Sequence, residues 1–99
     1  CGLLGEVFLA EGILSVANKR WEKANEAFHE AVDIHRRYKL PYYEARALFE
    51  LAEMHLLRND RGDRKQARQL LDQSLNVFGR IQAKRMMQKV QARKHGLGM

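Results

Sequence analysis

The side chains that could bind a metal ion or carry out catalysis are few: four histidines, one cysteine and scattered carboxylates. A helical zinc site needs histidines three or four residues apart. His29 and His35 are six residues apart, and no cysteine pair accompanies them. Cys1 has no neighbouring base, so its thiol is not favoured as a nucleophile. We therefore expect no metal site, no catalytic site and no enzyme activity.

The segment from Asn59 to Asp63 is rich in the residue types of turns and calcium loops. Arg61 interrupts the acidic pattern, and the distal bidentate glutamate of a calcium loop is missing. Arg61-Gly62-Asp63 also spells an integrin-binding tripeptide, but Gly62 suits a turn and Asp63 suits a helix start. The glycine spacing matches neither a phosphate-binding loop nor a dinucleotide fingerprint. The sequence therefore predicts no cofactor.

Positive charge is concentrated in the C-terminal part of the chain. The formal net charge is +6, with seven Lys and Arg against nine Asp and Glu up to Leu57, and eleven against three from there on. The last stretch carries a basic surface at helical spacing, made of Arg80, Lys84, Arg85, Lys89, Arg93 and Lys94. Such a helix can bind nucleic acid or a membrane surface. We favour a capping role, because the ends of helical arrays need a polar outer face.

Apolar residues recur at helical spacing throughout, and no stretch alternates as a strand would. The pattern predicts an all-α fold with five helices, over about 3–16, 21–34, 42–57, 63–78 and 81–94. Asn18 is suited to cap the second helix, Asp63 with Gln66 to start the fourth, and Gly79 to end it. The first helix is apolar on nearly all sides, so we expect it to be covered on more than one side.

Two pairs of helices share one pattern of small and large residues. A small residue in the first helix is followed in the second by an alanine, then by a large residue four positions on and a small one seven positions on. The residues are Gly12, Ala24, Phe28 and Ala31 in the first pair, and Ala52, Ala67, Leu71 and Ser74 in the second. Small residues let antiparallel helices approach closely, while the large one fills the gap toward the next pair.

This pattern resembles the tetratricopeptide (TPR) repeat, with Trp21 at the usual aromatic position before the first set. The spacing from Ala24 to Ala67 is 43 residues, longer than the family's usual period of about 34. The proline that is common after the second helix of a TPR pair is absent, and Arg36 and Gly79 occupy its places. The junction around Leu40-Pro41 is similar to the TPR arrays at the C-terminal ends of bacterial multidomain regulators.

The resemblance implies a right-handed α-solenoid fragment, with TPR-like repeats over 3–38 and 41–79, a capping helix over 80–95 and a frayed tail over 96–99. The first helix of each TPR pair lines a concave face, which would place there Leu9, Ile13, Val16, Phe49, Glu53 and Leu56. Such an apolar groove suits an amphipathic helix or an extended hydrophobic peptide. Alternatively, these residues pack against further repeats. The Lys, Asn and Arg clamp of chaperone-binding members is missing, which argues against a heat-shock-protein tail as ligand.

The implied function is a non-catalytic, cytoplasmic module for protein binding or self-association within a larger regulatory protein. A single cysteine agrees with that compartment. The alternative is a nucleic-acid-associating helical module that uses the basic C-terminal surface. Solenoids usually need about three repeats to bury a continuous core. We therefore expect either missing repeats or a second copy of the chain to cover the apolar first helix.

Overall fold

The computed structural model describes residues 2–99, and within them the protein is all-α, as the periodicity predicts. Five helices follow one another with no strand among these residues. They are α1 (Gly2–Ala17), α2 (Trp21–Arg37), α3 (Pro41–Arg58), α4 (Asp63–Arg80) and α5 (Lys84–Gly96). No helix in this part of the chain is long and apolar enough to cross a lipid bilayer.

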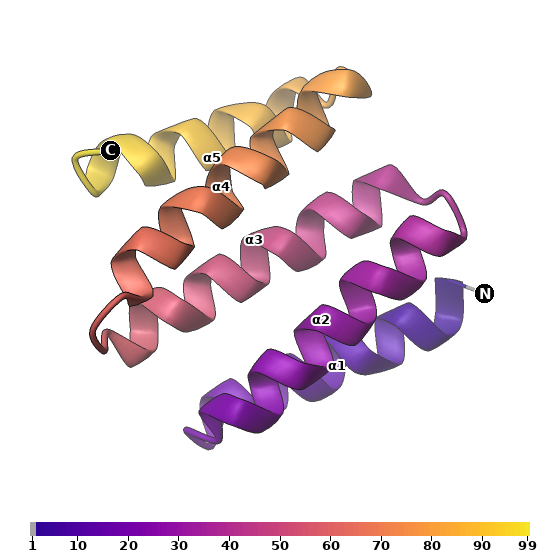
Figure 1. The fold of residues 1–99 in the computed structure, drawn as a ribbon. Helices are drawn as coiled ribbons and strands as arrows, with labels where there is room; N and C mark the ends of the chain where they lie inside the picture. The colour runs from indigo at the N-terminus through magenta and orange to yellow at the C-terminus, as the bar shows by residue number, and fades with distance from the viewer. Residues whose placement is uncertain (1) are drawn as a thin grey trace.

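Each helix packs against the next one along the chain and runs antiparallel to it (Figure 1). In addition, α1 makes a small contact with α3. The Cα positions extend over 34 × 28 × 17 Å, so the helices form a flattened array. The first helix, α1, and the last, α5, lie at its two ends. This arrangement leaves one side of each end helix without a neighbouring helix of the chain.

The turns after α1, α2 and α4 share one backbone geometry, in which a residue other than glycine takes a left-handed φ angle. Lys19, Lys39 and Gln82 have left-handed φ angles of 58°, 57° and 54°. In the first turn the Lys19 N–H donates to the Val16 carbonyl at 2.9 Å, and the Arg20 N–H donates to the Ser15 carbonyl at 2.8 Å. These two bonds satisfy carbonyls at the helix end, as glycine-ended helices usually do.

Two expected capping residues have other roles. Asn18 does not cap α2; its side-chain amide donates to the Leu14 carbonyl at 3.1 Å, so it belongs to the end of α1. Arg20 precedes α2 without a side-chain cap. Gly79 does not end α4, which continues to Arg80, because Gln82 supplies the left-handed turn. Asn18 and Gly79 indicated where these two turns lie, but not that Lys19 and Gln82 take the left-handed conformation.

The repeated small and large residues form the core of both helix pairs. Ala24, Phe28 and Ala31 of α2 are buried, as are their counterparts Ala67, Leu71 and Ser74 of α4. The Ser74 hydroxyl donates to the Ala45 carbonyl of α3 at 2.8 Å, which fixes the close approach of α4 to α3. The residues whose spacing predicted close helix contact therefore lie at the helix interfaces.

The last residues differ from the frayed tail expected over 96–99. Leu97 and Met99 are half-buried and pack against the core. The Met99 N–H donates to the Lys94 carbonyl at 2.9 Å, and Arg64 donates to the Leu97 carbonyl. Apolar side chains at both positions let the chain fold back onto α4, which glycine content alone does not indicate.

Candidate protein-interaction surfaces

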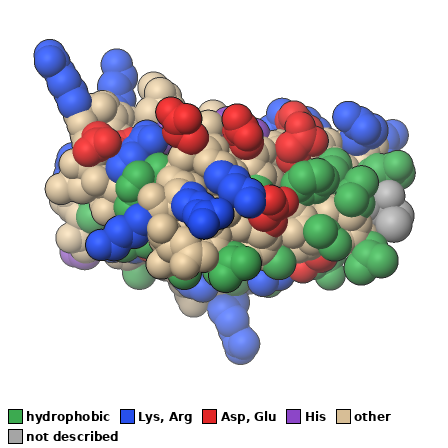
Figure 2. Space-filling view, turned by 90° about the horizontal axis from the view of Figure 1, so that it is seen from below, with side chains coloured by type: hydrophobic (Ala, Val, Ile, Leu, Met, Phe, Trp, Pro, Cys, Tyr) green, Lys and Arg blue, Asp and Glu red, His purple; other side chains and the backbone are tan. Residues whose placement is uncertain are grey.

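The outer side of α1 is an uninterrupted apolar surface. Within residues 3–17, each of the seven exposed side chains is apolar. Five of them recur at alternating spacings of four and three, and we call this set the α1 seam: Leu3, Val7, Ala10, Leu14 and Ala17. Leu3, Val7 and Leu14 are 73%, 54% and 64% exposed. Figure 2 shows hydrophobic side chains gathered at the end of the molecule where the N-terminal part of α1 lies. Contiguous exposed apolar surface is typical of an interaction site.

Two glycines on the opposite side of α1 hold this helix in place. A Cβ atom on Gly12 would lie 2.5 Å from the Phe28 ring, and one on Gly5 would lie 2.5 Å from the His35 ring. Both rings belong to α2 and are buried. Because only glycine leaves room for them, α1 lies directly against α2, and its seam necessarily faces away from the domain.

The second helix pair shows what covers such a surface. Gly5 and Gly12 of α1 correspond to Ala45 and Ala52 of α3, forty residues later in the sequence. By the same offset, Val7 and Leu14 of the seam correspond to Ala47 and Met54, which are both 0% exposed. Met54 lines a cavity together with Phe28 of α2, and Ala47, seven residues earlier, shares that side of α3. The side of α3 that corresponds to the α1 seam is therefore buried under a neighbouring helix, whereas the seam itself is exposed.

A polar notch lies beside the N-terminal end of the seam. A cavity of about 320 Å³ is lined by Leu3, Glu6, His35 and Tyr43. His35 is fully buried, and neither of its ring nitrogens has a hydrogen-bond partner within residues 2–99. Its Nε2 atom lies 3.7 Å from Oε1 of Glu6, and its ring stacks on Tyr43. Burial lowers the pKa of His35, although the Glu6 carboxylate opposes this effect.

The six residues predicted to line a concave apolar face differ in how exposed they are. Leu9 and Phe49 are buried in the core and are not available to a partner, because the neighbouring helices cover them. Val16, Glu53 and Leu56 are half-buried, and Ile13 is exposed. Periodicity placed all six on the first helices of their pairs but did not show how much of each the neighbouring helices would cover. An open apolar groove is therefore not formed by this set.

Ile13, Val16 and Glu53 do come together, in a cavity of only about 60 Å³ between α1 and α3. Two residues that the sequence analysis did not select, Glu50 and Leu57, line the same cavity. Burial and the nearby Glu53 carboxylate raise the pKa of Glu50. Their spacing of three and four residues from Glu53 along α3 was the available signal. At about 60 Å³ the cavity is well below the roughly 300–1,000 Å³ of typical ligand pockets.

The six residues of the predicted basic surface also differ in their contacts. Arg93 of α5 pairs with Glu53 of α3 at 2.7 Å, and Lys94 pairs with Asp72 of α4. The Lys89 ammonium lies 5.3 Å from the centre of the Phe49 ring. These three cations hold α5 against the domain, while Arg80, Lys84 and Arg85 are exposed. Half of the basic set therefore stabilises the helix contact and does not form a free cationic face.

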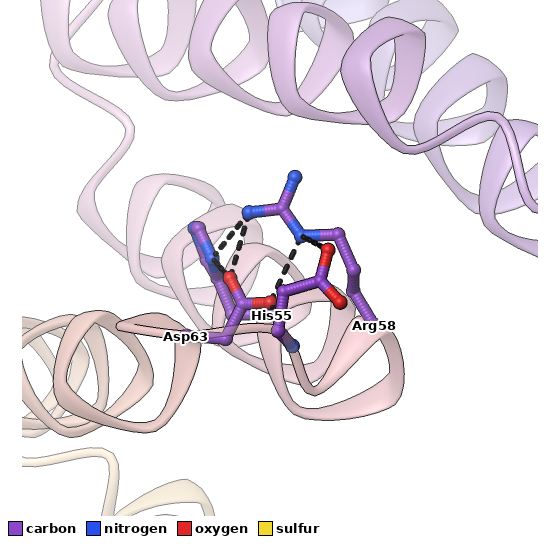
Figure 3. A network of polar contacts seen from close by, with 4 residues as sticks. His55, Arg58 and Asp63 are labelled. Atoms are coloured by element: carbon purple, nitrogen blue, oxygen red, sulfur yellow. Dashed lines mark hydrogen bonds and ion pairs between the residues drawn. The ribbon is translucent and has the colours of Figure 1, made fainter.

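The turn between α3 and α4 contains a buried polar network (Figure 3). The Asp63 carboxylate accepts from both Nε and an Nη atom of Arg58, at 2.9 and 2.7 Å, and from the Asp60 N–H at 2.7 Å. Nδ1 of His55 lies 2.6 Å from the same carboxylate. The Arg58 hydrogen bond, followed by that of His55, holds the pKa of Asp63 well below its usual range. The expected pairing of Asp63 with Gln66 is replaced by this network, which leaves Asp63 buried and not free for an integrin-type contact.

A polar cleft of about 500 Å³ lies next to this network and is lined by Glu22, Asn25, Glu26, His29, His55, Arg58 and Gln66. None of these lining residues has a hydroxyl or thiol group that could serve as a nucleophile. Within the described part of the chain, no group of three or more His, Cys, Asp or Glu side chains is placed to hold a metal ion. Cys1 lies outside the described residues.

Comparison of the chain with protein-family models, curated proteins and solved structures gave no match in any of the three.

Proposed function

We propose that the protein is a non-catalytic protein-interaction module that docks a helix of its partner onto the α1 seam. The observation that carries this proposal is the contrast within one molecule. Each exposed residue of 3–17 is apolar, while the corresponding Ala47 and Met54 of α3 are fully covered by a neighbouring helix. Because burying an apolar side chain releases free energy, a second helix on α1 is stabilised as α2 is on α3.

The repeated small and large residues support a TPR-like organisation of the module. In both pairs they lie at close helix contacts, at Gly12 with Phe28 and at Ser74 with Ala45. Arrays of this type associate through helix-on-helix packing. The partner surface that fits best is therefore an amphipathic helix with apolar residues at alternating three- and four-residue spacing.

Nucleic-acid binding through the basic C-terminal surface is less well supported. Three of its six candidate cations already contact Glu53, Asp72 or the Phe49 ring. The other three, Arg80, Lys84 and Arg85, are exposed, and so few phosphate contacts give weak binding with a shallow salt dependence.

The proposal is tested by titrating the protein with a synthetic helical peptide of that spacing, and with a peptide of the same composition in scrambled order. The backbone amide NMR signals of residues 3–17 should shift with the first peptide only. Leu14→Lys should weaken binding at least about tenfold, because it places a charge in the contact. Leu57→Lys is the matched control, since both leucines are 64% exposed but Leu57 lies on α3, outside the seam.

Two results would overturn the proposed function. One is equal binding of the ordered and the scrambled peptide. The other is a set of shifts that cluster on residues 80–94 and vanish with added salt, since that behaviour belongs to a charged ligand on α5.

A further inference from the structure

The outward side of α1 also indicates a specific partner. Resting on the proposed function of the α1 seam, we propose that the occupant is the α1 helix of a second copy of this chain, in an antiparallel, two-fold symmetric pair. Such an interface uses the same surface on both chains, so the surface must be complementary to itself.

Charge is the first requirement for self-complementarity, and α1 meets it. The seam itself has no charged residue. The two carboxylates of the helix, Glu6 and Glu11, lie at its flanks and are half-buried. Glu6 pairs with Arg46 and Glu11 with Lys23 of the same chain, each at 3.7 Å. Two α1 helices can therefore approach without bringing unpaired like charges together.

Side-chain size is the second requirement, and it selects the antiparallel orientation. The N-terminal end of α1 presents the bulky Leu3 and Leu4, and the C-terminal end presents the small Ala17, with Val7, Ala10, Ile13 and Leu14 exposed between them. A parallel pair would place the bulky ends together and leave a gap at Ala17. An antiparallel pair places the bulky end of each helix against the small end of the other, which fills space more evenly.

The other end of the chain does not offer a surface for the seam. The outward residues of α5 are polar or cationic except for Ala92 and Gly96. Head-to-tail stacking of copies would bury Lys84 and Arg85 against apolar side chains, which is strongly unfavourable. Of these two arrangements of copies, the pairing of α1 with α1 is the one that covers apolar surface with apolar surface.

The size of the seam sets the strength of the pair. A helix of sixteen residues is about 24 Å long. One helix from each chain covers less than the roughly 800 Å² per partner that stable complexes bury. The dimer should therefore dissociate on dilution.

Sedimentation velocity of the full chain across about a hundredfold range of concentration tests the pair. We expect a monomer at the low end and a dimer at the high end. Leu14→Lys should remain monomeric throughout, and Leu57→Lys should dimerise as the wild type does. Circular dichroism of each variant establishes that it remains folded. A wild-type chain that stays monomeric throughout would overturn the proposal, and so would equal loss of dimer in both variants.

Orientation is tested by crosslinking with a short bismaleimide, with Cys1 replaced by Ser. A mixture of Leu3→Cys and Ala17→Cys chains should give crosslinked dimers, because opposite ends of α1 meet. Ala17→Cys alone should give none, because its two copies lie about a helix length apart. Efficient crosslinking of Ala17→Cys alone would overturn the antiparallel arrangement. A monomeric chain that still binds the helical peptide through residues 3–17 would overturn the dimer and leave the proposed function standing.

Discussion

The two end helices, α1 and α5, occupy equivalent places at opposite ends of the array but present opposite surfaces. Each exposed side chain of 3–17 is apolar. The exposed residues of α5 are Lys84, Arg85, Gln88, Lys89, Gln91, Ala92, His95 and Gly96. The outer side of α5 shows that an end helix of the array can be polar. The apolar outer side of α1 is therefore not a consequence of its place at the end of the array. This difference supports the proposed association through α1, since the outer side of α5 is polar.

The two helices are also attached differently. α1 is fitted sterically against α2, with Gly5 and Gly12 under two buried rings. α5 has a single fully buried residue, Val90; Met86 and Met87 are half-buried against the core, and the helix also makes ion pairs such as Arg93 with Glu53. Steric fit fixes the position of α1 within narrow limits, whereas ion pairs on partly exposed side chains tolerate change.

The largest effect is expected at the attachment of α1. In Gly12→Ala, the added Cβ would lie 2.5 Å from the buried Phe28 ring. We expect the free energy of unfolding to fall by about 2–3 kcal/mol, measured by urea denaturation, because neither helix can move apart without losing other contacts. In the control Gly79→Ala, the nearest atom is 3.9 Å away, and a gain of about 0.5–1 kcal/mol is expected from helix propensity. Similar losses in both variants would show that α1 is not held by close contact.

A somewhat smaller effect is expected at the attachment of α5. Val90→Ala removes most of the only fully buried side chain of this helix. The loss should be about 2 kcal/mol, since about 0.8 kcal/mol is lost per buried methyl-sized group in addition to a cavity term. Hydrogen exchange should show α5 opening before the other helices. Gln91→Ala, at an exposed neighbouring position, should stay within about 0.5 kcal/mol of the wild type. If Val90→Ala proves equally mild, ion pairs carry more of this contact than burial indicates.

A pH-dependent effect should appear at the α1 end through His35. Its pKa is lowered in the folded state by burial and by Arg46, against Glu6 and Glu44. The unfolded chain therefore binds the proton more tightly, and stability falls as the pH drops below about 6.5, the ordinary pKa of histidine. The effect should be smaller than those of the two substitutions above, because Glu6 partly compensates an imidazolium.

The control for this pH dependence comes from the other helix pair. Phe78 stands in α4 where His35 stands in α2. His35→Phe should therefore be accommodated and should remove the loss of stability in this pH range, as followed by urea denaturation at several pH values. A pH profile that is unchanged in His35→Phe would assign the titration to another group.

Much of this contrast could be predicted from the sequence. Helical spacing gave five helices and an all-α fold, and it identified the first helix as apolar on nearly all sides. The repeated small and large residues around Phe28 and Leu71 located the core, because the position of a residue on a helix follows from spacing alone. What spacing cannot give is the amount of neighbouring helix over each residue. Leu9 was predicted to line a concave face and Leu14 was not, yet Leu9 is buried and Leu14 is exposed.

The polar contacts could not be predicted, because they join residues from different helices or across a turn. Arg93 lies forty residues from its partner Glu53, so no local pattern links them. Asp63 was expected to pair forward with Gln66, but its carboxylate turns back to Arg58 and His55. The direction in which such a side chain turns depends on the path of the preceding loop, which the turn residues indicate only in outline.

The smallest effect concerns the turns, where the two ends should behave alike. Lys19, after α1, and Gln82, before α5, have nearly equal left-handed φ angles, 58° and 54°. A side chain with a Cβ is strained in this conformation by about 1 kcal/mol, and glycine is not. Lys19→Gly and Gln82→Gly should each raise the free energy of unfolding by about 0.5–1 kcal/mol, since part of the gain is offset by the greater freedom of glycine in the unfolded chain. Lys65→Gly, inside α4, is the control and should lower it by about 1 kcal/mol. Unequal gains at positions 19 and 82 would mean that the turn at one end carries strain or contacts that the other lacks, and that the contrast between the ends extends from their surfaces to their backbone.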